Sequence, residues 1–337
     1  MGNEQQQDNQ QEDRHGHGHD AGAGHGHGHG SGSGSGHGAH AGQGHAHGHD
    51  HSAAPDPAAE AALAELLELD AEVLGAYLSE LMGWLGELTA DAPPRRIADL
   101  GSGTGTGTRA LLRQFEGAEA VALDMSETML DRFTEKAREA GIADQVRAVR
   151  ANLDEGWPQG EGLDSFDLIW ASASLHHMAD PDRSLAEILA ALRPGGLLVA
   201  AEMNTELPFP RFLPRDLGPG LGRPGLEDRC HAVVQERHTV DVPHLGDDWA
   251  ARLTRAGFKV EAVREFAIDL KDPLPAATGR YARATLRRLR EGLSDSLEAD
   301  DLAALDALVE DGGPHEISKR DDLTVQTSRT VYVARRA

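Results

Sequence analysis

The sequence predicts an α/β protein built on a doubly wound, mostly parallel β-sheet. Between about residues 95 and 202, short apolar segments with the length of buried strands alternate with longer segments of helical period, and Gly- or Pro-containing turns separate them. Such alternation is typical of parallel βαβ units, which wind in the right-handed sense. Helical periodicity also runs through 57–90, ahead of the first strand.

Each element carries its own local signal. Strands are expected at 96–100, 120–124, 146–152, 166–171, 197–201, 258–270 and 323–334. Helices are expected at 105–115, 126–140, 185–192, 249–256, 276–291 and 298–310. Ser126 is a suitable N-cap for its helix, and the turn Pro194-Gly195-Gly196 is expected to end the helix at 185–192. Residues 204–245 hold many Pro and Gly and little periodicity, which favours a lid or an insertion.

Residues 1–54 form a low-complexity tail of different composition. Twelve of the 18 histidines lie between His15 and His51, mostly alternating with Gly. This segment has almost nothing apolar to bury, so it is predicted to be disordered. Alternating imidazoles suit a divalent ion such as Zn²⁺, Ni²⁺ or Cu²⁺, and the candidates for weak metal binding are His15, His17, His19, His25, His27, His29, His45, His47 and His49. The alternative is a solubilising tail with incidental metal affinity, and no metal site is expected in the folded part.

Composition narrows the class of protein. The net charge is −24, and the sequence has no stripe of basic residues that would suit a phosphate backbone. Nucleic acid is therefore a disfavoured partner. Cys230 is the only cysteine, so a disulfide within the chain and a Cys-based zinc or iron–sulfur site are excluded. No apolar run is long enough to span a bilayer, and the polar N-terminus lacks the features of a signal peptide. A cytoplasmic protein without a membrane partner is expected.

A glycine-rich turn, Gly101-Ser102-Gly103-Thr104-Gly105, follows the first strand and opens a helix. Glycines there permit a tight turn and the close approach of a ligand to the helix N-terminus. A P-loop would end in Gly-Lys-Ser/Thr, and this segment has no Lys. A dinucleotide fingerprint beginning at Gly101 would need Gly or Ala in place of Thr106, and the frame that does fit, beginning at Gly105, starts too far beyond the strand.

Asp99 precedes these glycines, and the pattern Asp99-x-Gly101-x-Gly103-x-Gly105 resembles motif I of the class I S-adenosylmethionine-dependent methyltransferases. In that family the acidic residue orients the methionine end of the cofactor. A carboxylate suits a ligand with an ammonium and a sulfonium, whereas it would repel a pyrophosphate. The resemblance implies S-adenosylmethionine as the cofactor, contacted by Ser102 and the three glycines. As a structural alternative, Asp99 merely caps a turn.

Asp124 ends the second strand, where a carboxylate can accept both ribose hydroxyls of an adenosine, a need that NAD and S-adenosylmethionine sites share. Met125 next to it either packs on the adenine or belongs to the core. The later segments Ala151-Asn152-Leu153 and Leu192-Arg193-Pro194-Gly195-Gly196 extend the resemblance in order and at the usual spacing. It implies cofactor contacts from Asn152, Leu153 and Ala171. Asn152 departs from the commoner Asp, although its amide oxygen can still accept from the adenine amino group.

His176 and His177 are the candidate catalytic residues, because they lie in the loop where the transferred methyl group is expected to emerge. Methyl transfer is an in-line displacement in which positioning and desolvation supply most of the catalysis. A general base is needed only when the acceptor is protonated at the working pH, and either histidine suits that role. The alternative is that both are loop residues contacting the cofactor or the core. Glu202, after the fifth strand, is an alternative pocket carboxylate.

The resemblance implies a Rossmann-like methyltransferase fold with seven strands, the last of them antiparallel. The methyltransferase domain is assigned to 55–337, with N-terminal helices at 57–90, a cofactor-binding core at 95–202, and insertions at 204–245 and 275–311. The helices and insertions are expected to build the pocket for a small-molecule acceptor, whose identity and methylated atom the resemblance does not transfer. Two other classes stay open: a nicotinamide-dependent oxidoreductase, and a metal-binding protein that acts through its His-rich tail.

Overall fold

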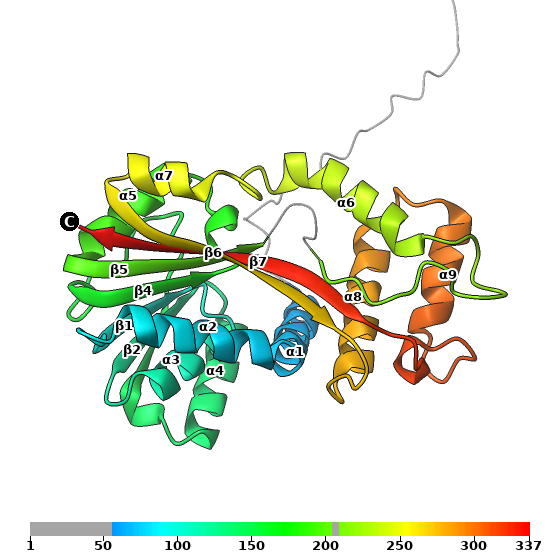
Figure 1. Cartoon of the computed structure of the whole chain (residues 1–337), viewed down its shortest axis with the longest axis horizontal. Helices are drawn as coiled ribbons and strands as arrows, with labels where there is room; N and C mark the ends of the chain where they lie inside the picture. Colours follow the sequence, from blue (N-terminus) through cyan, green and yellow to red (C-terminus); the bar gives the residue numbers. More distant parts are fainter. Residues whose placement is uncertain (1–55, 204–208) are drawn as a thin grey trace, which may run out of the picture. The chain divides into compact units, whose positions relative to one another are not determined.

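A computed structural model describes residues 56–203 and 209–337 (Figure 1). The predicted tail at 1–54, with all of its candidate metal-binding histidines, lies outside these residues, as does the segment 204–208 of the predicted insertion.

A seven-stranded sheet in the order β3-β2-β1-β4-β5-β7-β6 forms the centre of the described chain. Its strands are β1 (Arg96–Leu100), β2 (Glu119–Asp124), β3 (Val146–Arg150), β4 (Phe166–Ser172), β5 (Leu192–Met203), β6 (Phe258–Leu270) and β7 (Val325–Arg336). The first five strands are parallel, and β7 is antiparallel to both β5 and β6. The predicted fold, with its antiparallel last strand, is confirmed.

The helices follow the strands in the expected alternation. They are α1 (Pro57–Val73), α2 (Gly75–Leu88), α3 (Thr106–Gln114), α4 (Glu127–Glu139), α5 (Pro181–Ala191), α6 (Leu226–Asp241), α7 (Trp249–Arg255), α8 (Thr278–Gly292) and α9 (Ala299–Val309). Ser126 caps α4 as predicted, because its hydroxyl accepts a hydrogen bond from the Met129 amide at 3.2 Å.

Both faces of the central strands β1, β4 and β5 are buried, as the strands of a parallel sheet require. Along β4 the side chains alternate between two apolar clusters: Leu168 and Trp170 face the side covered by α2 and α3, while Ile169 and Ala171 face the side covered by α5 and α7. Asp99, Asp124 and Glu202 lie at or next to the carboxyl ends of β1, β2 and β5, at one edge of the sheet.

Three predicted boundaries near the site were wrong, and the last strand, predicted at 323–334, is Val325–Arg336. Strand β3 ends at Arg150, so Asn152 lies in the loop that follows it. Helix α5 begins at Pro181, four residues before the predicted start, because Asp180 caps it and a proline is favoured at the first helical position. The turn Pro194-Gly195-Gly196 lies inside β5 as a bulge, since β4 pairs first with Leu192 and next with Leu197.

The predicted irregular insertion at 204–245 contains helix α6, which is a further correction. Its buried positions Leu226, Cys230 and Val234 recur every fourth residue and form only a narrow apolar stripe among charged residues. Such a stripe gives a weak periodic signal, and the helix is stabilised by packing against residues distant in the sequence.

Residues 209–225 with α6, α8 and α9 pack together on one apolar core, and we call this unit the cap. Residues Leu69 and Val73 of α1 belong to the same core. The β6–β7 pair continues to Leu270 and Val325, past the last β5–β7 pair at Met203, and so leads from the sheet into the cap (Figure 1). Within the described ranges, no helix is both long and apolar enough to cross a membrane.

Candidate functional site

The glycine-rich turn joins β1 to α3 at the carboxyl edge of the sheet. Gly101, Gly103 and Gly105 all have positive φ angles, of +63°, +51° and +78°. At Gly105 the need for glycine is also steric, because an ideal Cβ would lie 1.9 Å from Cδ2 of Phe133. The tight turn and its close packing on α4 therefore both depend on residues without side chains.

Asp124 holds this turn from the end of β2. Its carboxylate accepts the amide of Gly103 at 2.8 Å through Oδ2 and the amide of Ser126 at 2.9 Å through Oδ1. Burial raises the pKa of Asp124 above its ordinary value. The two sequence motifs, the glycine-rich turn and the acid that ends the second strand, are therefore in direct contact.

Asp99 lies beneath the turn and is 2% exposed. Its Oδ2 accepts a hydrogen bond from the Thr108 hydroxyl at 2.6 Å. Burial raises the pKa of Asp99 to about 6. Gly107 brings α3 close to this carboxylate, since an ideal Cβ there would lie 2.6 Å from Nε1 of Trp170 and 3.2 Å from Oδ2 of Asp99.

The loop after β4 lies against the glycine-rich turn. An ideal Cβ at Gly101 would lie 2.8 Å from Cβ of Ser174, so the two loops touch. The hydroxyls of Ser102, Thr104 and Ser174 are buried and have no hydrogen-bond partner among the described residues. Buried polar groups in folded proteins are normally satisfied, so three such hydroxyls in adjoining loops are a feature typical of a polar ligand site.

His176 follows Ser174 and is held by Glu202 from the end of β5. The distance from Nδ1 of His176 to Oε2 of Glu202 is 2.5 Å, and Oε1 accepts the amide of Leu175 at 3.0 Å. Both side chains are almost fully buried. Nε2 of His176 has no partner among the described residues. An imidazole that donates Nδ1–H to a carboxylate carries its lone pair on Nε2, which is the arrangement of a general base.

The other predicted site residues differ in their exposure and contacts. His177 is exposed, with its ring 4.2 Å from that of His176, and Met125 is 56% exposed. The side chain of Asn152 bonds within its own loop, to Glu155 and the amide of Asp154. Leu153 is half-buried, while Ala171 is fully buried in the sheet.

Helix α1 contributes a residue that sequence reasoning missed. Glu60 accepts hydrogen bonds from the hydroxyls of Ser126 and Thr128, each at 2.6 Å, and these bonds lower the pKa of its carboxyl. The first turns of α1 are thereby attached to the start of α4, directly after Asp124. A glutamate in an amphipathic helix has no distinguishing local signal, so only the packing of α1 identifies it.

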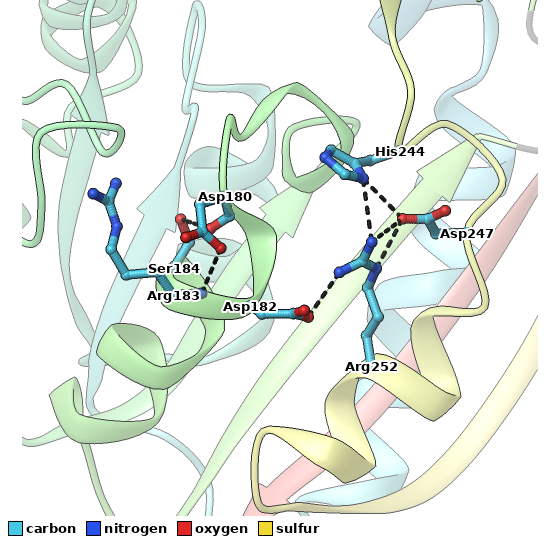
Figure 2. Close-up of polar contacts among 7 residues, drawn as sticks. All are labelled: Asp180, Asp182, Arg183, Ser184, His244, Asp247 and Arg252. Atoms are coloured by element: carbon cyan, nitrogen blue, oxygen red, sulfur yellow. Dashed lines mark hydrogen bonds and ion pairs between the residues drawn. The ribbon is translucent and has the colours of Figure 1, made fainter. Parts of the chain in front are cut away.

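The start of α5, immediately after the His176 loop, is fixed by charged residues. Figure 2 shows Arg252 of α7 between Asp182 and Asp247, with His244 beside them. Arg252 donates to Asp182 at 2.7 Å and to Asp247 at 2.8 Å. Asp180 accepts the amide of Arg183 at 3.0 Å and caps the helix. This network ties α5 to α7 directly after the loop that carries His176.

No cluster of three or more His, Cys, Asp or Glu side chains is arranged to hold a metal ion within 56–203 and 209–337.

Comparison with known proteins points to one family. A family model described as a methyltransferase domain matches residues 97–196, which contain the glycine-rich turn, Asp124 and the His176 loop. The chain is 40% identical over 110 residues to a demethylmenaquinone methyltransferase of Clavibacter sepedonicus, covering 33% of this chain and 42% of that protein. It is 34% identical over 114 residues to a ubiquinone/menaquinone biosynthesis C-methyltransferase of Vibrio vulnificus, again with 33% and 42% coverage.

The chain thus spans less than half the length of these curated relatives. Among solved structures, it is similar to an S-adenosylmethionine-dependent methyltransferase from Geobacter sulfurreducens in complex with S-adenosyl-L-homocysteine, at 19% identity, 76% and 90% coverage and a TM-score of 0.42. The glycine-rich turn lies within the match to the methyltransferase domain, which favours a methyltransferase over a nicotinamide-dependent oxidoreductase.

Proposed function

We propose that the chain is a class I S-adenosylmethionine-dependent methyltransferase that methylates a small-molecule acceptor with His176 as general base. S-adenosylmethionine is the cofactor of this family. When bound, it supplies an electrophilic methyl group on a sulfonium. The single observation that carries the proposed mechanism is the buried His176–Glu202 pair, in which Nε2 of His176 has no partner among the described residues. The loop that carries His176 contacts the glycine-rich turn through Ser174.

Four groups of the turn and its surroundings suit the cofactor. We assign Asp99 to the ammonium of its methionine end, because a buried carboxylate without a cationic partner favours a positive ligand group. Asp124 is assigned to the ribose hydroxyls. The unpartnered hydroxyls of Ser102, Thr104 and Ser174 supply donors and acceptors for its polar atoms. Asn152, Leu153 and Met125 are assigned to the adenine end on the resemblance to the family.

In the proposed reaction the acceptor is an O–H or N–H group. Nε2 of His176 takes its proton while the acceptor atom forms a bond to the methyl carbon and the bond from that carbon to sulfur breaks. The imidazolium that results is stabilised by the Glu202 carboxylate at 2.5 Å. Deprotonation at the moment of transfer avoids the formation of a cationic product, which is the contribution a base makes to such a step.

The acceptor is proposed to be a small molecule because the cap adjoins the carboxyl edge of the sheet as a packed unit. Its apolar core also includes α1, which is tied to α4 through Glu60. The quinone-related names of the relatives do not transfer, since the family match stops at residue 196 and the cap lies beyond it.

The first test is cofactor binding. Titration calorimetry of the full chain with S-adenosylhomocysteine is expected to show saturable binding that Asp124→Ala weakens and Asp99→Ala weakens further, with the fold retained by circular dichroism. Wild-type affinity in both variants would refute the site, and binding of NADH in place of S-adenosylhomocysteine would refute the family function.

The second test identifies the acceptor. Metabolite extracts are incubated with methyl-labelled S-adenosylmethionine and the full chain, and the labelled product is identified by mass spectrometry. His176→Gln is expected to abolish labelling while S-adenosylhomocysteine still binds. Undiminished labelling by His176→Gln would eliminate the general-base role but leave the methyltransferase assignment intact.

A further inference from the structure

A cavity of about 610 Å³ lies between α1, α2 and α3, with side chains from α4 and α8 at its wall. None of the predicted cofactor-binding residues lines it. Its volume is within the range of sites that hold small molecules, roughly 300–1,000 Å³. The cavity is strongly charged, with four cationic and three acidic side chains among its lining residues.

Two of the four cations are engaged by acids of the same cavity. Lys136 lies 3.3 Å from Glu68, and Arg280 lies 3.4 Å from Glu72. These pairs connect α1 to α4 and to α8, so they have a structural role and leave little charge for a ligand. The third acid of the wall, Glu65, is exposed.

Arg109 and Arg113 differ from the other two cations, because neither forms an ion pair with any described carboxylate. Arg109 donates only to the carbonyl of Gly105 at 3.3 Å and the hydroxyl of Thr106 at 3.4 Å. Arg113 is one helical turn further along α3, and like charges at this spacing destabilise a helix. Burial, and next the charge of Arg113, lower the pKa of Arg109, while the charges of Glu68 and Glu139 oppose this shift.

The feature that sets Arg109 and Arg113 apart is that they line the same cavity one helical turn from each other. The chain has 56 acidic and only 32 basic residues, so carboxylates are abundant. Neither arginine forms an ion pair with the acids of the wall, and Arg109 uses only Nε and one Nη in its hydrogen bonds to Gly105 and Thr106. The remaining N–H donors suit an anion, because guanidinium groups bind phosphate and carboxylate oxygens in pairs.

We propose that this cavity is a binding site for a small polyanion, held by Arg109 and Arg113 and separate from the site of methyl transfer. The anion would relieve the repulsion between the two guanidiniums. The occupant carries phosphate or carboxylate groups, which share the planar pairs of oxygens that guanidinium recognises. Glu65 at the wall opposes such a ligand and restricts the site to anions of high charge.

Inorganic pyrophosphate and citrate are the probes, titrated separately into the full chain by calorimetry at low salt. Arg113→Ala is expected to weaken binding roughly tenfold, the loss of about one charge-assisted contact. Arg255→Ala is the matched control. Like Arg113, Arg255 is exposed and lies in the last turn of its helix, but it does not line the cavity. The substitution therefore removes the same charge at a distance from the site. Its affinity is expected to equal that of wild type.

Two further variants sharpen the result. Arg109→Gln is expected to weaken binding at least as much as Arg113→Ala, and Glu65→Gln to strengthen it several-fold by removing the opposing charge. Tighter binding of pyrophosphate than of citrate would identify phosphate as the group recognised, and the reverse order carboxylate. The proposal is overturned if neither probe binds saturably, or if Arg255→Ala weakens binding as much as Arg113→Ala does.

Discussion

Nδ1 of His176 and Oε2 of Glu202 lie 2.5 Å apart, although 26 positions separate the two residues in the sequence. The exposed fractions of the two side chains are 1% and 2%. The second oxygen of Glu202 accepts the amide of Leu175, so one carboxylate fixes both the ring and the loop that carries it. In the proposed reaction Glu202 is therefore a positioning residue for His176.

Glu202→Gln is expected to lower kcat by about a hundredfold, within the usual contribution of a general base. An amide donates N–H to Nδ1, which favours the tautomer with its proton on Nε2 and removes the lone pair that accepts the acceptor's proton. The Leu175 amide retains an oxygen partner, so KM for S-adenosylmethionine is expected to stay unchanged. The measurement is the pH–rate profile with the acceptor identified above, in which the variant should lose its acidic limb.

Glu316→Gln is the control for that variant. Glu316 is also a buried glutamate that accepts a backbone amide, from Gly312 at 2.9 Å, but it contacts none of the site residues. It is expected to keep the wild-type profile. An equal fall in kcat for both variants, with no change in the pH profile, would mean that Glu202 has only a structural role.

The affinity for S-adenosylhomocysteine is expected to fall as the pH is lowered from about 8 to about 5. The pKa of Asp99 is raised to about 6, so its carboxyl takes a proton within this interval and loses its charge for the ligand's ammonium. Calorimetric titrations across the interval measure the slope. In Asp99→Asn the affinity should be low throughout, with any remaining slope due to Asp124; a full wild-type slope in this variant would contradict the assignment.

Asp99→Asn is also expected to stabilise the protein at neutral and alkaline pH. The carboxyl of Asp99 has a pKa of about 6 when folded against an ordinary value of 3.8, so the folded state binds the proton more tightly. In the wild type this tighter proton binding stabilises the folded state fully below a pH of 3.8, and the stabilisation is lost as the pH rises through about 6. The pKa shift corresponds to about 3 kcal/mol. Urea unfolding at about pH 8 should give a difference in unfolding free energy between Asp99→Asn and wild type that approaches this value. Equal stability at that pH would show that Asp99 is charged without cost.

Gly105→Ala is expected to destabilise the protein by at least about 2 kcal/mol, because a φ of +78° is unfavourable for alanine and its Cβ would collide with Phe133. Gly83→Ala is the control. Gly83 lies inside α2 and nothing is within 4 Å of an ideal Cβ there, so alanine should stabilise the helix by about 0.5–1 kcal/mol. Thermal unfolding of both variants measures the difference, and a loss in Gly83→Ala similar to that in Gly105→Ala would count against the steric explanation.

Much of the fold could be predicted from local sequence, and so could the part of the candidate site formed by Asp99, the glycine-rich turn and Asp124. The alternation of apolar segments predicted the parallel strands, because each short run must be buried on both faces of a sheet. The spacing of Asp99, Gly101, Gly103 and Gly105 predicted a tight turn after β1, since a chain that reverses over so few residues needs positive φ angles. Asp124 could be placed at the same edge because the carboxyl ends of parallel strands meet there.

Packing between distant segments decided the rest. The bulge in β5 depends on how β4 pairs with Leu192 and Leu197, and α6 depends on an apolar stripe that only the cap can bury. His176 and Glu202 were both visible as candidates in the sequence, but their contact follows from β4 and β5 being neighbours, which brings the two strand ends together. Local propensity acts over a few residues, whereas the partner of a buried polar group is chosen by the topology of the sheet. The sequence by itself therefore determined the glycine-rich turn, and the tertiary structure determined which ring nitrogen of His176 has no partner among the described residues.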